Sequence, residues 1–79
     1  MTTNDRLYKF ILKCTKNASK PDLHSFTINV DGGMAFVDCC GEGVRIEVCG
    51  DMPESYIGSE FGAACFLEAR NAEFDSIEM

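Results

Sequence analysis

The features that usually reveal a membrane or secreted protein are missing from this sequence of 79 residues. No apolar run approaches the roughly 20 residues that are needed to cross a bilayer. The first five residues do not place an apolar segment behind a basic one, as a secretory signal does. We therefore expect a cytoplasmic protein that has no membrane partner.

Motifs for catalysis and cofactor binding are missing as well. His24 is the only histidine, and no local signature places a cysteine beside it, so a cysteine–histidine catalytic pair is not expected. The glycine turn at 41–43 lacks the Lys and Ser/Thr of a phosphate-binding loop. With 13 acids, carboxylate pairs arise by chance and carry no specificity. We expect no enzyme activity, no catalytic residue and no cofactor.

The five cysteines do not form a recognisable framework. Their number is odd and their spacing is unlike that of a small disulfide-bonded domain, which favours a reducing compartment. No C-x2-C knuckle is present, so we predict no metal site and interpret the cysteines as small apolar core residues. A metal or redox module remains the alternative. It would use Cys39, Cys40, Cys49 and His24.

The length and the pattern of apolar residues predict a single small α+β domain over residues 1–79. Residues 26–49 alternate apolar and polar side chains in runs that are separated by glycine turns at 31–33 and 41–43. This is typical of a three- to four-stranded antiparallel meander. Residues 53–70 then predict one C-terminal helix, with Ile57, Phe61, Ala64 and Cys65 on the face toward the sheet.

Both ends of the chain allow two interpretations. Residues 6–15 fit a strand, which we favour because four lysines along one helical face would repel one another. They also fit a helix that presents Leu7, Phe10, Ile11 and Cys14 on one side. Residues 72–79 fit either a short edge strand or a tail, and residues 63–70 leave a further strand open instead of a helix.

The charge is divided unevenly along the chain. Residues 1–20 carry five basic residues against one acid, a net charge of +4, whereas residues 21–79 carry twelve acids against two arginines, a net charge of −10. Phosphate binding needs clustered Lys and Arg, so direct binding of nucleic acid is not expected. A partner protein with a basic surface is favoured instead.

A small, acidic chain without a catalytic motif resembles, in type and not in residues, many small inhibitors, including phage-encoded anti-defence and anti-CRISPR proteins. That resemblance implies a viral protein that works in the cytoplasm of a host cell. It also implies that the chain acts as a nucleic-acid mimic, blocking the basic surface of a nucleic-acid-handling protein. The partner-binding residues that we predict are Asp38, Glu42, Glu47, Glu54, Tyr56, Glu60 and Phe66.

Tyr56 and Phe66 are expected to be exposed anchors among those acids, since aromatic residues dominate binding hot spots. A further alternative is a homo-oligomeric accessory domain, for example a homodimer. In that case a second copy would cover the mismatched face of the helix predicted over residues 53–70, where Phe66 points away from the sheet and Glu68 lies near the apolar stripe.

Overall fold

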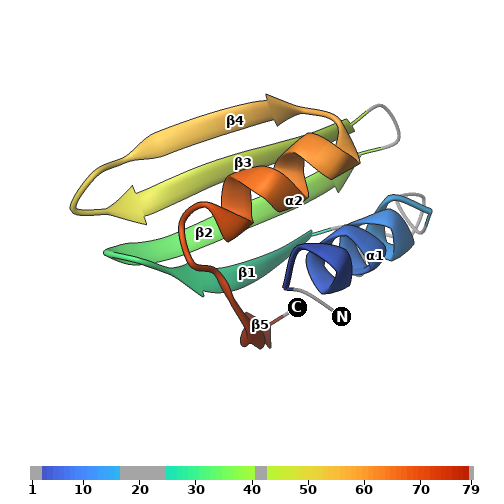
Figure 1. Cartoon of the computed structure of the whole chain (residues 1–79). Helices are drawn as coiled ribbons and strands as arrows, with labels where there is room; N and C mark the ends of the chain where they lie inside the picture. Colours follow the sequence, from blue (N-terminus) through green and yellow to red (C-terminus); the bar gives the residue numbers. More distant parts are fainter. Residues whose placement is uncertain (1–2, 17–24, 41–42, 79) are drawn as a thin grey trace.

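One five-stranded sheet and two helices make up the described part of the chain (Figure 1). The computed structural model describes residues 3–16, 25–40 and 43–78. The elements, in chain order, are α1 (Thr3–Lys16), β1 (Ser25–Val30), β2 (Gly33–Cys40), β3 (Gly43–Gly50), β4 (Glu54–Gly58), α2 (Glu60–Glu68) and β5 (Glu73–Glu78). The strand order is β4-β3-β2-β1-β5, and every neighbouring pair is antiparallel. The predicted α+β class is confirmed, with one strand more than the sequence indicated.

Both helices lie on the same side of the sheet (Figure 1). The register places Phe26 of β1, Val37 of β2 and Ile46 of β3 in one row, and all three side chains are buried. Leu7 of α1 and Leu67 of α2 belong to the same buried cluster. Every apolar residue on this face of the three central strands is therefore covered, and the core is a single layer between sheet and helices.

The first element is a helix, so the preference for a strand over residues 6–15 is wrong. Leu7, Ile11 and Cys14 follow each other at i, i+4 and i+7 and are all buried. Lys9 and Lys16 lie on the exposed side. The lysine repulsion that argued against a helix is weak there, because water and salt screen charges at the surface. The free energy gained by burying the apolar stripe of the helix exceeds the cost of this repulsion.

The helix predicted over residues 53–70 is two elements. Residues 54–58 form β4, which pairs with β3 in a hairpin, and α2 begins only at Glu60. The Ser59 side chain caps α2, because its hydroxyl accepts a hydrogen bond from Gly62 N at 3.1 Å. The backbone hydrogen bonds of the hairpin and the capping bond of Ser59 are together more favourable than a helix that continues through residue 59. The alternative of a further strand at 63–70 is also wrong.

The last element corrects the prediction of a C-terminal helix, because β5 follows α2 and forms an edge of the sheet. Its pairing with β1 is interrupted by a bulge between the pairs Thr27–Glu78 and Asn29–Glu73. The Ser76 hydroxyl fills the gap: it accepts from Asn29 N at 2.8 Å and donates to Glu73 O at 2.6 Å. The edge strand expected as one of two options for residues 72–79 is thus present.

Candidate functional site

The face of the sheet opposite the helices is not covered by any described element (Figure 1). The register places Thr27 of β1, Phe36 of β2 and Glu47 of β3 in one row across this open face. Phe36 is 49% exposed although it lies on the middle strand of the sheet. A large ring at this position gains little from folding, so it marks the open face as a surface available for binding.

Further apolar and charged residues surround Phe36. Met34 precedes it by two positions on the same strand and is 40% exposed, and Ile57 on the edge strand β4 is 76% exposed. Asp38 lies opposite Arg45 in the neighbouring row, and Glu78 of β5 lies opposite Thr27. The open face therefore has an apolar centre with a predominantly acidic border.

A shallow hollow of about 200 Å³ lies beside the Phe36 ring. Its lining includes Phe36, Thr27, Asp38 and Glu78, so an apolar wall meets two carboxylates. A second hollow of about 370 Å³, toward the β4 edge, is lined in part by Glu47 and Ser55, and its carboxylate on the open face is that of Glu47. A lysine or arginine side chain suits such a hollow, because its stem packs on apolar surface while its charged head pairs with a carboxylate.

The structure divides the predicted partner-binding residues into two groups. Asp38 of β2 and Glu47 of β3 are exposed on the open face, on strands that are consecutive in the chain and neighbours in the sheet. Glu54, Tyr56 and Phe66 lie on the other side of the sheet, between β4 and α2. Glu60 lies half-buried in the first turn of α2, and Glu42 lies outside the described residues.

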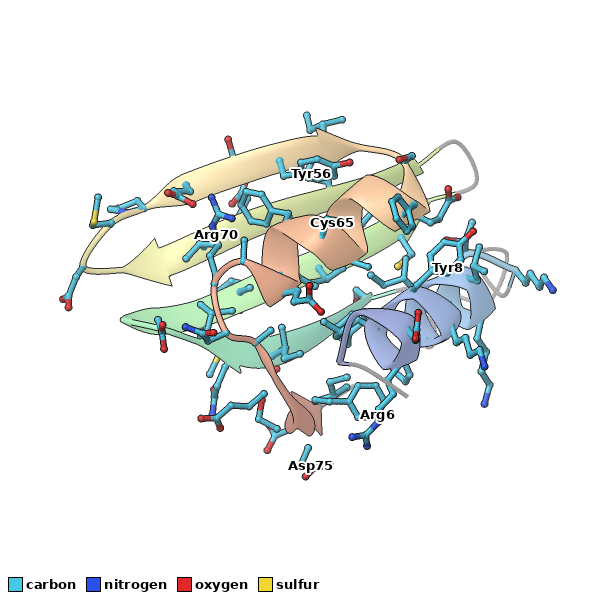
Figure 2. All side chains as sticks on the ribbon, in the orientation of Figure 1. Arg6, Tyr8, Tyr56, Cys65, Arg70 and Asp75 are labelled. Carbon is cyan, nitrogen blue, oxygen red and sulfur yellow. The ribbon has the colours of Figure 1, made fainter. Side chains whose placement is uncertain are left out.

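Glu54, Tyr56 and Phe66 form a clasp between β4 and α2, which we call the Arg70 clasp after the residue that joins them. Figure 2 labels Tyr56 and Arg70 of this clasp. The Arg70 guanidinium lies 3.5 Å from the centroid of the Phe66 ring and pairs with the Glu54 carboxylate. The Tyr56 and Phe66 rings pack at 5.3 Å. Both rings are half-buried and not exposed as expected, and the contacts described for them lie within the chain. Their role in partner binding stays a prediction.

Two glycines make room for the Tyr56 ring. A Cβ at Gly62 would lie 2.1 Å from the Tyr56 hydroxyl oxygen, and one at Gly58 would lie 2.5 Å from it. The same hydroxyl donates a hydrogen bond to Ser59 O at 3.2 Å. The two glycines therefore seat one aromatic side chain at the junction of β4 and α2.

The cysteines are distributed over both faces of the sheet. Cys39 is buried under the helices together with Cys14, whereas Cys49 is exposed on the open face. A metal site that uses both Cys39 and Cys49 is therefore not formed, because the sheet lies between them. No group of three ligand-type residues gathers within residues 3–16, 25–40 and 43–78, and His24 is outside those ranges.

Burial sets the ionisation of the two core cysteines. Burial, and to a smaller extent the neighbouring Cys14 side chain, raise the pKa of the Cys39 thiol to about 12. Burial also raises the pKa of Cys14, against a smaller opposing effect of its hydrogen bond with Cys39. Both thiols are protonated at neutral pH, which makes them poor nucleophiles and poor metal ligands.

Sequence reasoning missed Phe36 and Met34 as surface residues. The available signal was the alternation along residues 34–40, where the smaller side chains Ala35 and Val37 alternate with the larger ones. Alternation defines two faces but not which one is covered. The larger residues face outward here, because the helices pack closely on the smaller ones.

No family model, curated protein or solved structure matches this chain. In addition, none of the described helices is long and apolar enough to span a membrane.

Proposed function

We propose that the protein works by binding a partner protein through the open face of its sheet, and that this contact blocks a basic, nucleic-acid-binding surface of the partner. The observation that carries the proposal is the half-exposed Phe36 ring at the centre of a sheet face bordered by acids. A stoichiometric inhibitor of the anti-defence type needs such a surface and no catalytic group.

The apolar part of the open face supports a protein partner. Phe36, Met34 and Ile57 stay partly in water in the free chain, and their burial against a partner would release that water. Aromatic residues near the centre of a surface patch are frequent hot spots, because the surrounding contacts exclude water from them.

The charge supports a basic partner. Glu47 and Glu78 are exposed on the two sides of Phe36, and the chain as a whole carries a net charge of −6. Opposite charge on the partner speeds encounter and disfavours wrong partners. Lysine or arginine side chains that normally hold phosphates would fit the acid-lined hollows beside Phe36 and toward β4.

The test compares three variants of the tagged full chain in affinity capture from cells of the source: Phe36→Ser, Glu47→Lys and Glu68→Lys. Glu68 is exposed on α2, in the helix layer, so its reversal changes the net charge as much as that of Glu47 but on the other side of the molecule. We expect a captured basic protein to be lost with the first two variants and retained with the third.

The captured protein is then purified and tested for binding to its nucleic acid with increasing amounts of this chain. We expect the chain to displace the nucleic acid at near-equimolar ratio, and the Phe36→Ser variant to require at least about tenfold more, the loss expected for truncating one hot-spot side chain. Equal capture by all three variants, or nucleic-acid binding that the chain leaves unchanged, would contradict the proposal. Circular dichroism of each variant checks that the fold is intact.

A further inference from the structure

β4 is an end strand of the sheet, and among the described strands it pairs only with β3 (Figure 1). Two of its residues, Ser55 and Ile57, are exposed, and Ile57 is 76% exposed. Their side chains lie on the open face, since Ser55 is in register with Glu47 and Ile57 with Arg45. The outer side of β4 therefore offers backbone groups that have no strand partner in the described part of the chain.

The direction of these backbone groups follows from one hydrogen bond near the opposite edge. Asn29 N–H points away from β2, because it donates to the Ser76 hydroxyl of β5 at 2.8 Å. Along an antiparallel strand the backbone groups alternate in direction, and two residues in register point either toward each other or away from each other. Applied through the three unbroken registers from β1 to β4, this rule turns the N–H and C=O of Ser55 and Ile57 outward and those of Tyr56 toward β3.

The two edges of the sheet differ in their protection against a further strand. The pairing of β5 is interrupted by a bulge, and three of its six residues are acids. Bulges and charges are devices that keep other strands away from an edge. β4 pairs without a bulge, contains neither lysine nor proline, and has a single acid, Glu54, which pairs with Arg70. The β4 edge is thus the one at which an extended segment can add.

We propose that the partner protein adds an extended, basic segment to β4 as a further antiparallel strand, with an arginine or lysine beside Ser55 and an apolar residue beside Ile57. This inference rests on the proposed function and specifies how the basic partner is held. Hydrogen bonds to the outward backbone groups supply affinity in strand addition, and the side chains supply specificity. A second copy of this chain is a poorer occupant, because it brings a further net charge of −6.

The side chains along the edge determine what the added strand must carry. A residue opposite Ser55 lies two strand spacings, about 10 Å, from Glu47. Ser55 is short, so an arginine or lysine can extend over it toward the Glu47 carboxylate and the hollow of about 370 Å³ that both residues line. Opposite Ile57 an apolar residue is favoured, because Ile57 is exposed and Arg45 follows it in that row.

The first test uses a synthetic peptide and does not depend on capture of the partner. Its sequence is threonine-valine-threonine-arginine-threonine with both ends capped, so valine lies beside Ile57 when arginine lies beside Ser55 in an antiparallel pair. We add it to the isotope-labelled full chain and follow amide exchange by NMR. Exchange at Ser55 and Ile57 should slow at least about tenfold near saturation, with little change at Tyr56, whose amide already faces β3.

Matched peptides separate the contribution of the backbone from that of charge. N-methylation of the valine and the arginine blocks the hydrogen bonds of the added strand and should abolish the slowing, whereas N-methylation of the central threonine should be tolerated. Glutamate in place of arginine should weaken binding several-fold. The inference is overturned if the peptide leaves exchange at both amides unchanged at its highest soluble concentration, or if the peptide methylated at valine and arginine binds as well as the unmodified one.

The second test compares Ser55→Pro with Ser55→Ala in the tagged full chain. Both variants lack the hydroxyl, but only proline removes the outward N–H, and it leaves the hydrogen bonds to β3 in place. We expect Ser55→Pro to weaken binding of the captured basic protein at least about tenfold and Ser55→Ala to leave it near the wild-type value. Circular dichroism checks that both variants are folded.

The outcomes of the second test distinguish this inference from the proposed function. If capture depends on Phe36 and Glu47 but is equal for the two Ser55 variants, strand addition is wrong and the proposed function stands. If no basic protein is captured, the proposed function fails, and amide exchange in the presence of the peptide decides whether β4 accepts a further strand.

Discussion

At the scale of single residues, the Tyr56 hydroxyl and Gly62 show how closely β4 and α2 approach each other. Alanine normally stabilises a helix interior by roughly 1 kcal/mol relative to glycine. At Gly62 the new Cβ would lie 2.1 Å from the Tyr56 hydroxyl oxygen. We therefore expect Gly62→Ala to lower the free energy of unfolding by about 1–3 kcal/mol, as overpacking does. Urea denaturation followed by circular dichroism measures the change.

A double-mutant cycle identifies the cause. Tyr56→Phe removes the oxygen that clashes and leaves the ring, so Gly62→Ala should cost less in the Tyr56→Phe background than in the wild type. The two changes should be non-additive by at least about 0.5 kcal/mol, as expected for residues in contact. Additive effects would mean that the clash is relieved elsewhere and that Gly62 is needed for another reason.

At the scale of elements, the Ser76 side chain is one of two means by which β5 is attached to the sheet. The ladder between β1 and β5 is broken by the bulge, and the Ser76 hydroxyl takes the hydrogen bond from Asn29 N. We expect Ser76→Ala to lower the free energy of unfolding by about 1–2 kcal/mol, because that amide loses its partner. Hydrogen exchange should speed up at Asn29.

Ser55→Ala is the matched control, since Ser55 is exposed on the other edge strand, β4, and faces the open side of the sheet. Its replacement should change the stability by less than about 0.5 kcal/mol, as for most surface substitutions. If Ser76→Ala is as mild as Ser55→Ala, water replaces the hydroxyl at the bulge and β5 is held by its aromatic contacts with α1.

Those contacts are the second means by which β5 is held. Phe10 of α1 packs edge-on against Phe26 of β1 at 4.9 Å and against Phe74 of β5 at 5.9 Å. The Arg6 guanidinium lies 4.3 Å from the Phe74 ring centroid and pairs with Asp75 at 3.6 Å (Figure 2). The first and last described elements, α1 and β5, therefore stabilise each other.

At the scale of the whole molecule, the negative net charge opposes the self-association that the exposed apolar surface favours. At pH 7 the charge of −6 keeps copies of the chain apart. Near the sequence pI of about 4.5 that repulsion vanishes, and Phe36 and Ile57 remain exposed. We expect sedimentation velocity to show a monomer at pH 7 and self-association near pH 4.5.

The Phe36→Ser variant should associate less than the wild type at pH 4.5, with the fold monitored by circular dichroism at both pH values. A stable dimer at pH 7 that survives in 20 mM and in 500 mM NaCl would contradict this expectation. It would favour the homo-oligomeric alternative, since screening by salt would then have no influence on assembly.

The sequence by itself determined the class of fold, the central meander and the turn between β1 and β2. In residues 26–49 apolar residues at every second position match the strand period, and the turn between β1 and β2 follows from Gly32, whose φ of 77° suits glycine. The division of charge and the absence of catalytic motifs were also plain from composition. The acids Asp38 and Glu47 were correctly expected on the strands' exposed positions.

Tertiary structure alone decided the remaining points. Residues 6–15 satisfy helical and strand periods equally, and only the packing of Leu7 and Ile11 against the sheet selects the helix. Likewise, the aromatic residues at 56 and 66 are equally suited to a surface or a clasp, and Arg70 selects the clasp. Which face of the sheet stays open, with Phe36 at its centre, depends on where both helices pack, and a strand pattern with two alternating faces does not contain that information.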